Sequence, residues 1–100
     1  LDWQWRNCGV TTEHPEYDLL PSEYFRRQCH ACTWFEEGAF LSALELLGPD
    51  CILYETDFPH PVCLYPRPLE QVHDALADLT SEDRRKVLSG NAARVYNIPL

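Results

Sequence analysis

The feature that most constrains the fold is a short apolar run at residues 51–54 (Cys-Ile-Leu-Tyr), which carries no charge. Gly48 and Pro49 precede the run, and a Pro-rich segment follows it from Pro59. Such a run between turn residues predicts a strand that is buried on both faces, as in a parallel sheet. Acidic residues follow the run closely, which places carboxylates at the C-terminal end of the predicted strand.

A second strand and a helix are predicted before this run. Residues 28–35 mix Cys, Ala, Thr, Trp and Phe, which is typical of a short strand. Residues 36–47 begin with two acids, carry an apolar stripe and stop at a Gly-Pro pair, which predicts a helix. Further upstream, one or two helical turns are predicted after Pro21, with Ser22 as the N-cap residue.

Helical spacing returns after the Pro-rich segment. Apolar residues repeat every three or four positions over residues 69–79, which predicts an amphipathic helix. Thr80 and Asp83 occupy the capping-box positions of a third helix that is expected to run to about residue 89. Gly90 is expected to break that helix before a final helical turn.

The order strand, helix, strand, helix, helix indicates an α/β fold with a parallel sheet. Residues 1–21 are expected to form a connection, with a helical remnant at residues 1–8. Two parallel strands alone do not make a stable sheet, because their unpaired edges invite association. We therefore expect the chain to be a slice of a larger sheet, and the absence of Met favours an incomplete reading frame.

Composition excludes several classes of function. A formal net charge of −8 argues against a nucleic-acid partner, because contacts to phosphates require clustered Lys and Arg. The longest apolar stretches fall far short of the ~20 residues that a membrane-spanning helix needs, and no secretory signal is recognisable. The five cysteines are an odd number and cannot all pair within one chain, which favours reduced thiols in the cytoplasm.

The acids after the apolar run are the first candidates for chemistry. Strand alternation puts Leu53, Glu55 and Asp57 on one face and the even-numbered residues 52–56 on the other. The even face is expected to pack on helices, and the odd face to point into a site, because parallel α/β folds build active sites at this end of their strands. The pattern equally allows Asp57 to be a turn residue and His60 a solvated loop histidine.

Three segments resemble the amidohydrolase-related family (amidohydrolase family 2), whose relatives include aminocarboxymuconate-semialdehyde decarboxylase and the resorcylate decarboxylases. Residues 55–61 (Glu-Thr-Asp-Phe-Pro-His-Pro) resemble the end of its last barrel strand. Residues 20–27 (Leu-Pro-Ser-Glu-Tyr-Phe-Arg-Arg) resemble its segment before strand seven, and residues 90–96 (Gly-Asn-Ala-Ala-Arg-Val-Tyr) its C-terminal helix. All three occur in the order and spacing of the family.

The resemblance implies that the chain is the C-terminal fragment of a single metal-dependent (β/α)8 TIM-barrel domain. It would contribute strands seven and eight with their helices, as less than half of a barrel that typically needs ~250 residues. Residues 1–21 would be the connection from the preceding helix, and residues 22–98 the family-like region. The whole enzyme would hydrolyse or decarboxylate a small organic substrate.

The resemblance also implies roles for two residues. In the family one divalent ion, often zinc, is held by a His-x-His pair on strand one and a His on strand five. An Asp at the end of strand eight completes or adjoins the site. Asp57 matches that Asp, as metal ligand and general base for a bound water, and His60 would contact substrate at the rim. The chain contains no His-x-His, so we expect it to be inactive alone and to associate as a homo-oligomer or with the missing barrel.

Two alternatives come from other classes of protein. The first is a non-catalytic module that self-associates through its sheet edges. The second is a small zinc-binding module built from four cysteines and His60 (Cys29, Cys32, Cys51 and Cys63). Extended residues three apart point to opposite faces, which weighs against a shared metal at Cys29 and Cys32 and favours free core cysteines. Glu55 is expected either to tune the site or to bind a neighbouring strand.

Overall fold

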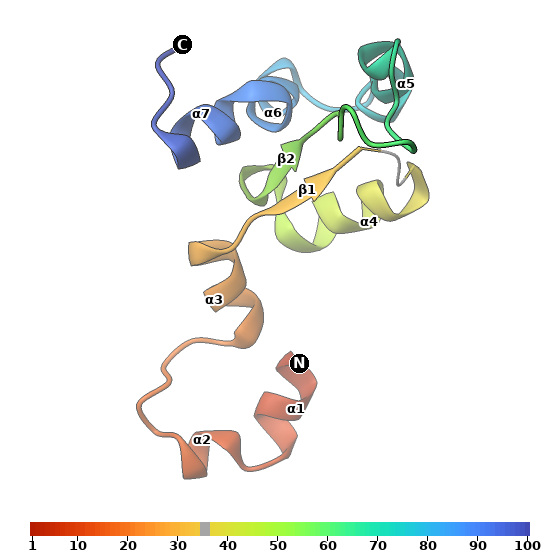
Figure 1. Ribbon diagram of the computed structural model, residues 1–100. Coiled ribbons are helices and arrows are strands. Elements are labelled where there is room, and N and C mark those ends of the chain that lie inside the picture. The colour runs from red at the N-terminus through yellow and green to blue at the C-terminus, as the bar shows by residue number, and fades with distance from the viewer. Residues whose placement is uncertain (35–36) are drawn as a thin grey trace.

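The centre of the molecule is a two-stranded parallel sheet (Figure 1). The computed structural model describes residues 1–34 and 37–100. Strand β1 (Ala31–Thr33) pairs with β2 (Ile52–Tyr54) in parallel, with Ala31 opposite Ile52 and Thr33 opposite Tyr54. Because the two strands are parallel, their C-terminal ends meet at the same edge, as the alternation of elements predicts.

A helix and a short turn connect the two strands. Helix α4 (Glu37–Leu47) is followed by the 3-10 turn η1 (Pro49–Cys51), which leads directly into β2. The predicted strand over residues 28–35 is limited to three residues, because helix α3 takes up its first position. Phe35 and Glu36, which belong to the predicted strand and helix, lie outside the described residues.

The hydrophobic core lies on one face of the sheet. Its buried members come from α4, β2 and the helices that follow β2, and they are Phe40, Ile52, Val72, Leu76 and Val87. Tyr54 packs against this cluster, whereas Leu53, on the opposite face of β2, is buried outside it. The expectation that the even-numbered residues of β2 pack on helices is therefore confirmed for Ile52 and Tyr54.

The helices after β2 differ from the prediction at two points. Helix α5 is Pro68–Ala75, and the chain then turns, with the Leu79 N–H donating to the Leu76 carbonyl at 3.1 Å. The predicted helix over residues 69–79 is therefore too long. The turn lets Leu76 enter the core, where the residue is only 1% exposed.

Helix α6 (Ser81–Arg85) begins as predicted, with the Thr80 hydroxyl accepting the Asp83 N–H at 3.1 Å. The prediction of a break at Gly90 is wrong, because the π-helical turn η2 (Lys86–Gly90) runs straight into helix α7 (Asn91–Tyr96). Gly90 has helical angles, φ −61° and ψ −40°. A Cβ there would lie 3.2 Å from Arg85 Nη1, the end of a flexible side chain, and 3.4 Å from the Arg85 carbonyl oxygen.

The N-terminal residues form helices rather than a bare connection. Helix α1 (Asp2–Asn7) matches the predicted helical remnant, and α2 (Val10–Glu13) was not predicted. Figure 1 shows both of them away from the sheet, beyond α3 (Pro21–Gln28). None of the residues in these three helices is buried.

The start of α3 corrects the prediction that Ser22 is its N-cap. The cap is Leu20, and Pro21 occupies the first helical position, where its missing N–H costs nothing. The Glu23 carboxylate accepts the Leu20 N–H at 2.7 Å. Ser22 instead donates its N–H and its hydroxyl to the Asp2 carboxylate at 2.9 and 2.6 Å, which ties α1 to α3.

No helix among the described residues combines the length and the apolar character needed to cross a membrane.

Candidate functional site

The candidate site lies in the turn that follows β2. The Glu55 N–H donates to the Thr33 carbonyl at 3.0 Å, so the ladder continues one residue past Tyr54. Asp57 then adopts a positive φ of 55°, a left-handed conformation that Asp tolerates better than most residues. The alternation used to place Asp57 on the Leu53 face therefore ends before that residue. Asp57 still lies at the C-terminal end of the sheet, three residues beyond the last residue of β2.

Two successive turns bring His60 back to Asp57. The His60 N–H donates to the Asp57 carbonyl at 2.8 Å, and the Cys63 N–H donates to the His60 carbonyl at 3.0 Å. The two side chains meet, with His60 Nδ1 3.2 Å from Asp57 Oδ2. The Asp57 side chain is 33% exposed and the His60 side chain 59% exposed. The predicted site residues are thus brought together, with the carboxylate the more shielded of the two.

Glu55 faces a different neighbour. Cys32 pairs with Leu53 in the sheet register. The Glu55 carboxylate is close enough to the Cys32 thiol to disfavour its thiolate form. Partial burial, and secondly the nearby Glu55 carboxylate, raise the pKa of the Cys32 thiol. Cys32, Leu53 and Glu55 therefore share the sheet face that lies opposite the core.

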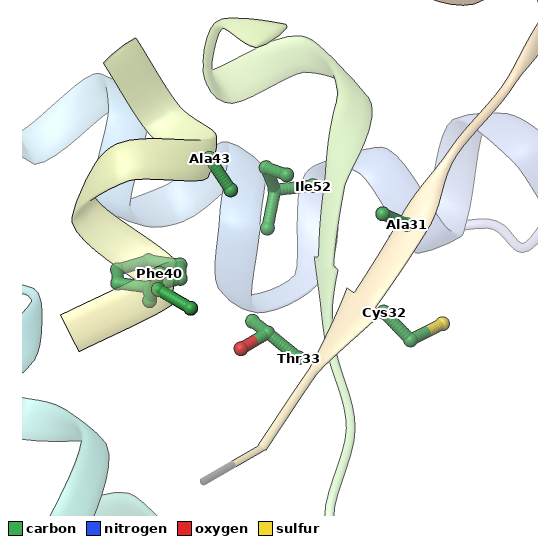
Figure 2. A pocket seen from close by; sticks show the side chains of 7 residues that line it. Ala31, Cys32, Thr33, Phe40, Ala43 and Ile52 are labelled. Atoms are coloured by element: carbon green, nitrogen blue, oxygen red, sulfur yellow. The ribbon is translucent and has the colours of Figure 1, made fainter. Parts of the chain in front are cut away.

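Figure 2 shows the other face of the sheet, where α4 covers the strands. Thr33 and Ile52 point toward Phe40 and Ala43 of α4, whereas Cys32 points away. A cavity of about 160 Å³ lies between α4 and the strands, with mostly apolar walls. The polar side chains among the residues that line it are Cys32 and Thr33.

A second cavity adjoins the Asp57 turn. Its volume is about 270 Å³, and its walls are Thr56, Phe58, Tyr65 and Pro68. The rings of Phe58 and Tyr65 lie 5.3 Å apart, and both side chains are more than 60% exposed. The loop that carries the candidate site therefore presents aromatic surface beside it.

The opposite end of the strands is closed by Asn91 and Arg94, which the sequence placed in the final helical turn without indicating a contact to the strands. Asn91 is 2% exposed and donates its side-chain amide to the carbonyls of Pro49 and Ile52, both at 2.7 Å. Arg94 donates to the Asp50 carbonyl at 2.9 Å and lies 3.4 Å from His30 Nε2. In the sequence, the signal for such an anchor is an amide side chain that stands among small apolar residues at the start of a helix.

The metal that the family resemblance implies would need several ligating side chains, of which the described residues offer few. Within residues 1–34 and 37–100, no group of three or more His, Cys, Asp or Glu side chains is close enough to hold an ion. Asp57 fits one ligand position, because a carboxylate at the C-terminal end of the strands is a normal ligand for a divalent cation. The described residues thus offer one carboxylate of a suitable kind and do not form a complete metal site.

The cysteines do not gather into a zinc module in the described part of the chain. Cys29 lies near Cys51, whereas Cys32 lies near Glu55. All five cysteines are unpaired thiols. Only Cys51 is fully buried, and Cys8 and Cys32 are exposed, so the prediction of core cysteines holds for Cys51 alone.

Comparison with known proteins places the chain in a family. A family model described as amidohydrolase matches residues 4–98. The crystal structure of 5-carboxyvanillate decarboxylase LigW from Sphingomonas paucimobilis matches with a TM-score of 0.68 and 25% sequence identity. That match covers 97% of this chain and 30% of the decarboxylase, so the chain spans less than a third of that protein's length.

No curated protein sequence matches the chain. The family model nevertheless covers residues 4–98, and the structural match covers 97% of the chain. The expected family is confirmed, and the mixed α/β fold corresponds to part of a TIM-barrel enzyme. The chain belongs to amidohydrolase family 2.

Proposed function

We propose that this chain supplies strands seven and eight, with their helices, to a metal-dependent barrel enzyme of amidohydrolase family 2. The enzyme hydrolyses or decarboxylates a small organic substrate. The observation that carries the proposal is the position of Asp57, partly shielded at the C-terminal end of two parallel strands, where barrel enzymes place their catalytic groups. Residues 1–21 are then the connection from the preceding helix, and residues 22–98 belong to the barrel.

Asp57 has two roles in this proposal. Its carboxylate would help to hold the divalent cation, for which zinc is the first candidate, and in hydrolysis it would accept a proton from water as general base. In decarboxylation the ring carbon that loses CO₂ must gain a proton, which the protonated Asp57 carboxyl group would deliver as general acid. The cation supplies Lewis acidity, which lowers the pKa of a water molecule bound to it to about 7. The other ligands come from residues outside the described part of the chain.

The structural match supports a substrate class for the proposed enzyme. The matched protein is a 5-carboxyvanillate decarboxylase, whose named substrate is a carboxylated aromatic ring. The exposed Phe58 and Tyr65 rings beside the Asp57 turn are suited to contact such a ring. Loss of CO₂ from a carboxylated aromatic acid is therefore the first reaction to test.

The remainder of the barrel is the proposed partner of this chain. Among the described residues β1 and β2 pair only with each other, so each strand has an edge without a strand partner. The same edges favour the second candidate, a non-catalytic module that forms homo-oligomers through its sheet. The unpaired thiols support a reducing, cytoplasmic compartment for either candidate.

One experiment separates the two candidates. The 100-residue chain and a polypeptide that also carries the remaining barrel strands are purified, and bound metal and CO₂ release from 5-carboxyvanillate are measured. Bound metal and turnover in the longer polypeptide alone support the enzyme. A metal-free, inactive longer polypeptide, together with stable oligomers of the 100-residue chain in light scattering, supports the interaction module instead.

A further inference from the structure

We infer that Asn91 determines where another strand can pair with β2. Its side-chain amide donates to the Ile52 carbonyl at 2.7 Å, on the edge of β2 that faces away from β1. A strand that adds to this outer edge therefore bonds to Tyr54 and not to Ile52. The inference rests on the proposed function only for the source of that strand, which is the remainder of the barrel.

The direction of the backbone groups in β2 identifies the outer edge. The Glu55 N–H donates to the Thr33 carbonyl at 3.0 Å, so the backbone groups of Glu55 and of Leu53 point toward β1. Backbone groups of successive residues in a strand point to opposite edges. Ile52 and Tyr54 therefore direct their N–H and carbonyl groups away from β1. Helix α7 contacts β2 on this side of the sheet (Figure 1).

Asn91 excludes an added strand by the space that its side chain occupies. A carbonyl oxygen can accept two hydrogen bonds, so the bond to Ile52 does not by itself exclude a second donor. The Asn91 amide, however, is also fixed by the Pro49 carbonyl at 2.7 Å, and the residue is only 2% exposed. Neighbouring strands lie only about 4.7–4.9 Å apart, and the Asn91 side chain fills that gap beside Ile52.

Tyr54 is the first position of the outer edge that another strand can use. Its side chain is held elsewhere, because the hydroxyl donates to the Pro68 carbonyl at 2.9 Å. Among the hydrogen bonds of the described residues, none from a side chain reaches the Tyr54 carbonyl. The surface thus fits an extended backbone segment whose ladder begins at Tyr54 and continues toward the Asp57 turn.

The first test uses the unmodified sequence within the longer polypeptide that carries the remaining barrel strands. NMR couplings across hydrogen bonds identify which nitrogen donates to a ¹³C-labelled carbonyl. For Ile52 we expect a coupling to the side-chain nitrogen of Asn91, and for Tyr54 a coupling to a backbone nitrogen of another strand. A backbone nitrogen of another strand at the Ile52 carbonyl overturns the inference.

The second test asks whether Asn91 is the cause of this limit. Asn91→Ala in the longer polypeptide empties the gap beside Ile52, and we expect the Ile52 carbonyl to gain a coupling to a backbone nitrogen of the added strand. Ser89→Ala, an exposed control in the preceding turn, should leave both couplings unchanged. A folded Asn91→Ala variant whose Ile52 carbonyl gains no strand partner overturns the inference, because Asn91 then does not limit the pairing.

Hydrogen exchange in the 100-residue chain decides if Asn91→Ala does not fold. The side-chain amide protons of Asn91 should exchange at least about 100-fold more slowly than those of the exposed Asn97. Equal exchange rates overturn the inference, because an amide that opens freely to water does not hold the edge of β2.

A failure of this inference is distinct from a failure of the proposed function. Metal binding and turnover, together with a strand bonded to Ile52 or with no strand on Tyr54, overturn the inference and leave the proposed function intact. A strand on Tyr54 without metal or turnover, whether from the barrel or from a second copy of the chain, contradicts the proposed function and leaves the inference intact. If Tyr54 has no strand partner and turnover is also absent, both fail.

Discussion

The two ends of the strand pair are built in opposite ways. At the N-terminal end, side chains of α7 bind backbone carbonyls, and Asn91 alone satisfies two of them from a position that is 2% exposed. At the C-terminal end a Pro-rich loop exposes aromatic rings, and Asp57 and His60 contact each other. One end is closed by buried hydrogen bonds, and the other is left open to solvent.

The closed end therefore contributes to the stability of the fold, whereas the open end is where chemistry can take place. A buried carbonyl that loses its donor costs about 1–3 kcal/mol, so changes at the closed end are expected to unfold the chain. Polar groups at the open end exchange their partners for water at little cost. An acid there can change without loss of the fold, which is the arrangement that barrel enzymes use.

The largest expected effect is at the open end. Asp57→Asn should lower turnover of the complete barrel protein by about 10²- to 10⁴-fold, because the carboxyl group that transfers the proton is lost. Its free energy of unfolding should change by no more than about 0.5 kcal/mol. Steady-state CO₂ release and urea unfolding measure the two quantities, with the exposed Asp78→Asn as control. Full activity of Asp57→Asn would show that the carboxylate is not needed.

The next effect is at the closed end. Asn91→Ala removes the donor of two buried hydrogen bonds and should lower the free energy of unfolding by about 2–4 kcal/mol. Urea denaturation measures the change. Ser89→Ala, an exposed position in the preceding turn, should stay within about 0.5 kcal/mol. A loss below about 1 kcal/mol for Asn91→Ala would remove the distinction between the two ends.

Cysteine reactivity compares the two ends within one sample. Cys51 lies at the closed end and is 2% exposed, and burial raises the pKa of its thiol. Cys63 lies in the open loop and is only half-buried. At pH 8 iodoacetamide should modify Cys51 at least about 100-fold more slowly than Cys63, as followed by mass spectrometry of peptides. Equal rates would mean that the closed end opens readily.

The smallest effect concerns the helices that precede β1. The Ser22 hydroxyl and, secondly, its N–H hold the pKa of Asp2 below its ordinary value of 3.8. A lowered pKa stabilises the fold above the ordinary value, and this stability is lost as the pH falls through the folded value. Ser22→Ala should raise the pKa of Asp2 toward 3.8, measured by NMR titration of the carboxyl carbon. An unchanged pKa would mean that α1 does not dock on α3.

Sequence patterns predicted the central elements well and their limits poorly. The apolar run at residues 51–54 indicated β2 and its parallel pairing, and Thr80 with Asp83 indicated the start of α6. The predicted break at Gly90 is absent, because a glycine inside a helical segment and a glycine at a helix end look the same in a sequence. The strand predicted over residues 28–35 is too long, because local propensity does not show that Gln28 is the last residue of α3.

For the candidate site, too, some features were determined by the sequence and others only by the tertiary structure. The sequence by itself determined that two acids follow the second strand and that three motifs point to one family, because residue type and order carry that information. Only the tertiary structure decided that Asp57 leaves the strand alternation, that His60 returns to it and that Asn91 closes the far end. These contacts depend on backbone angles and on packing between distant segments, which a linear pattern does not encode.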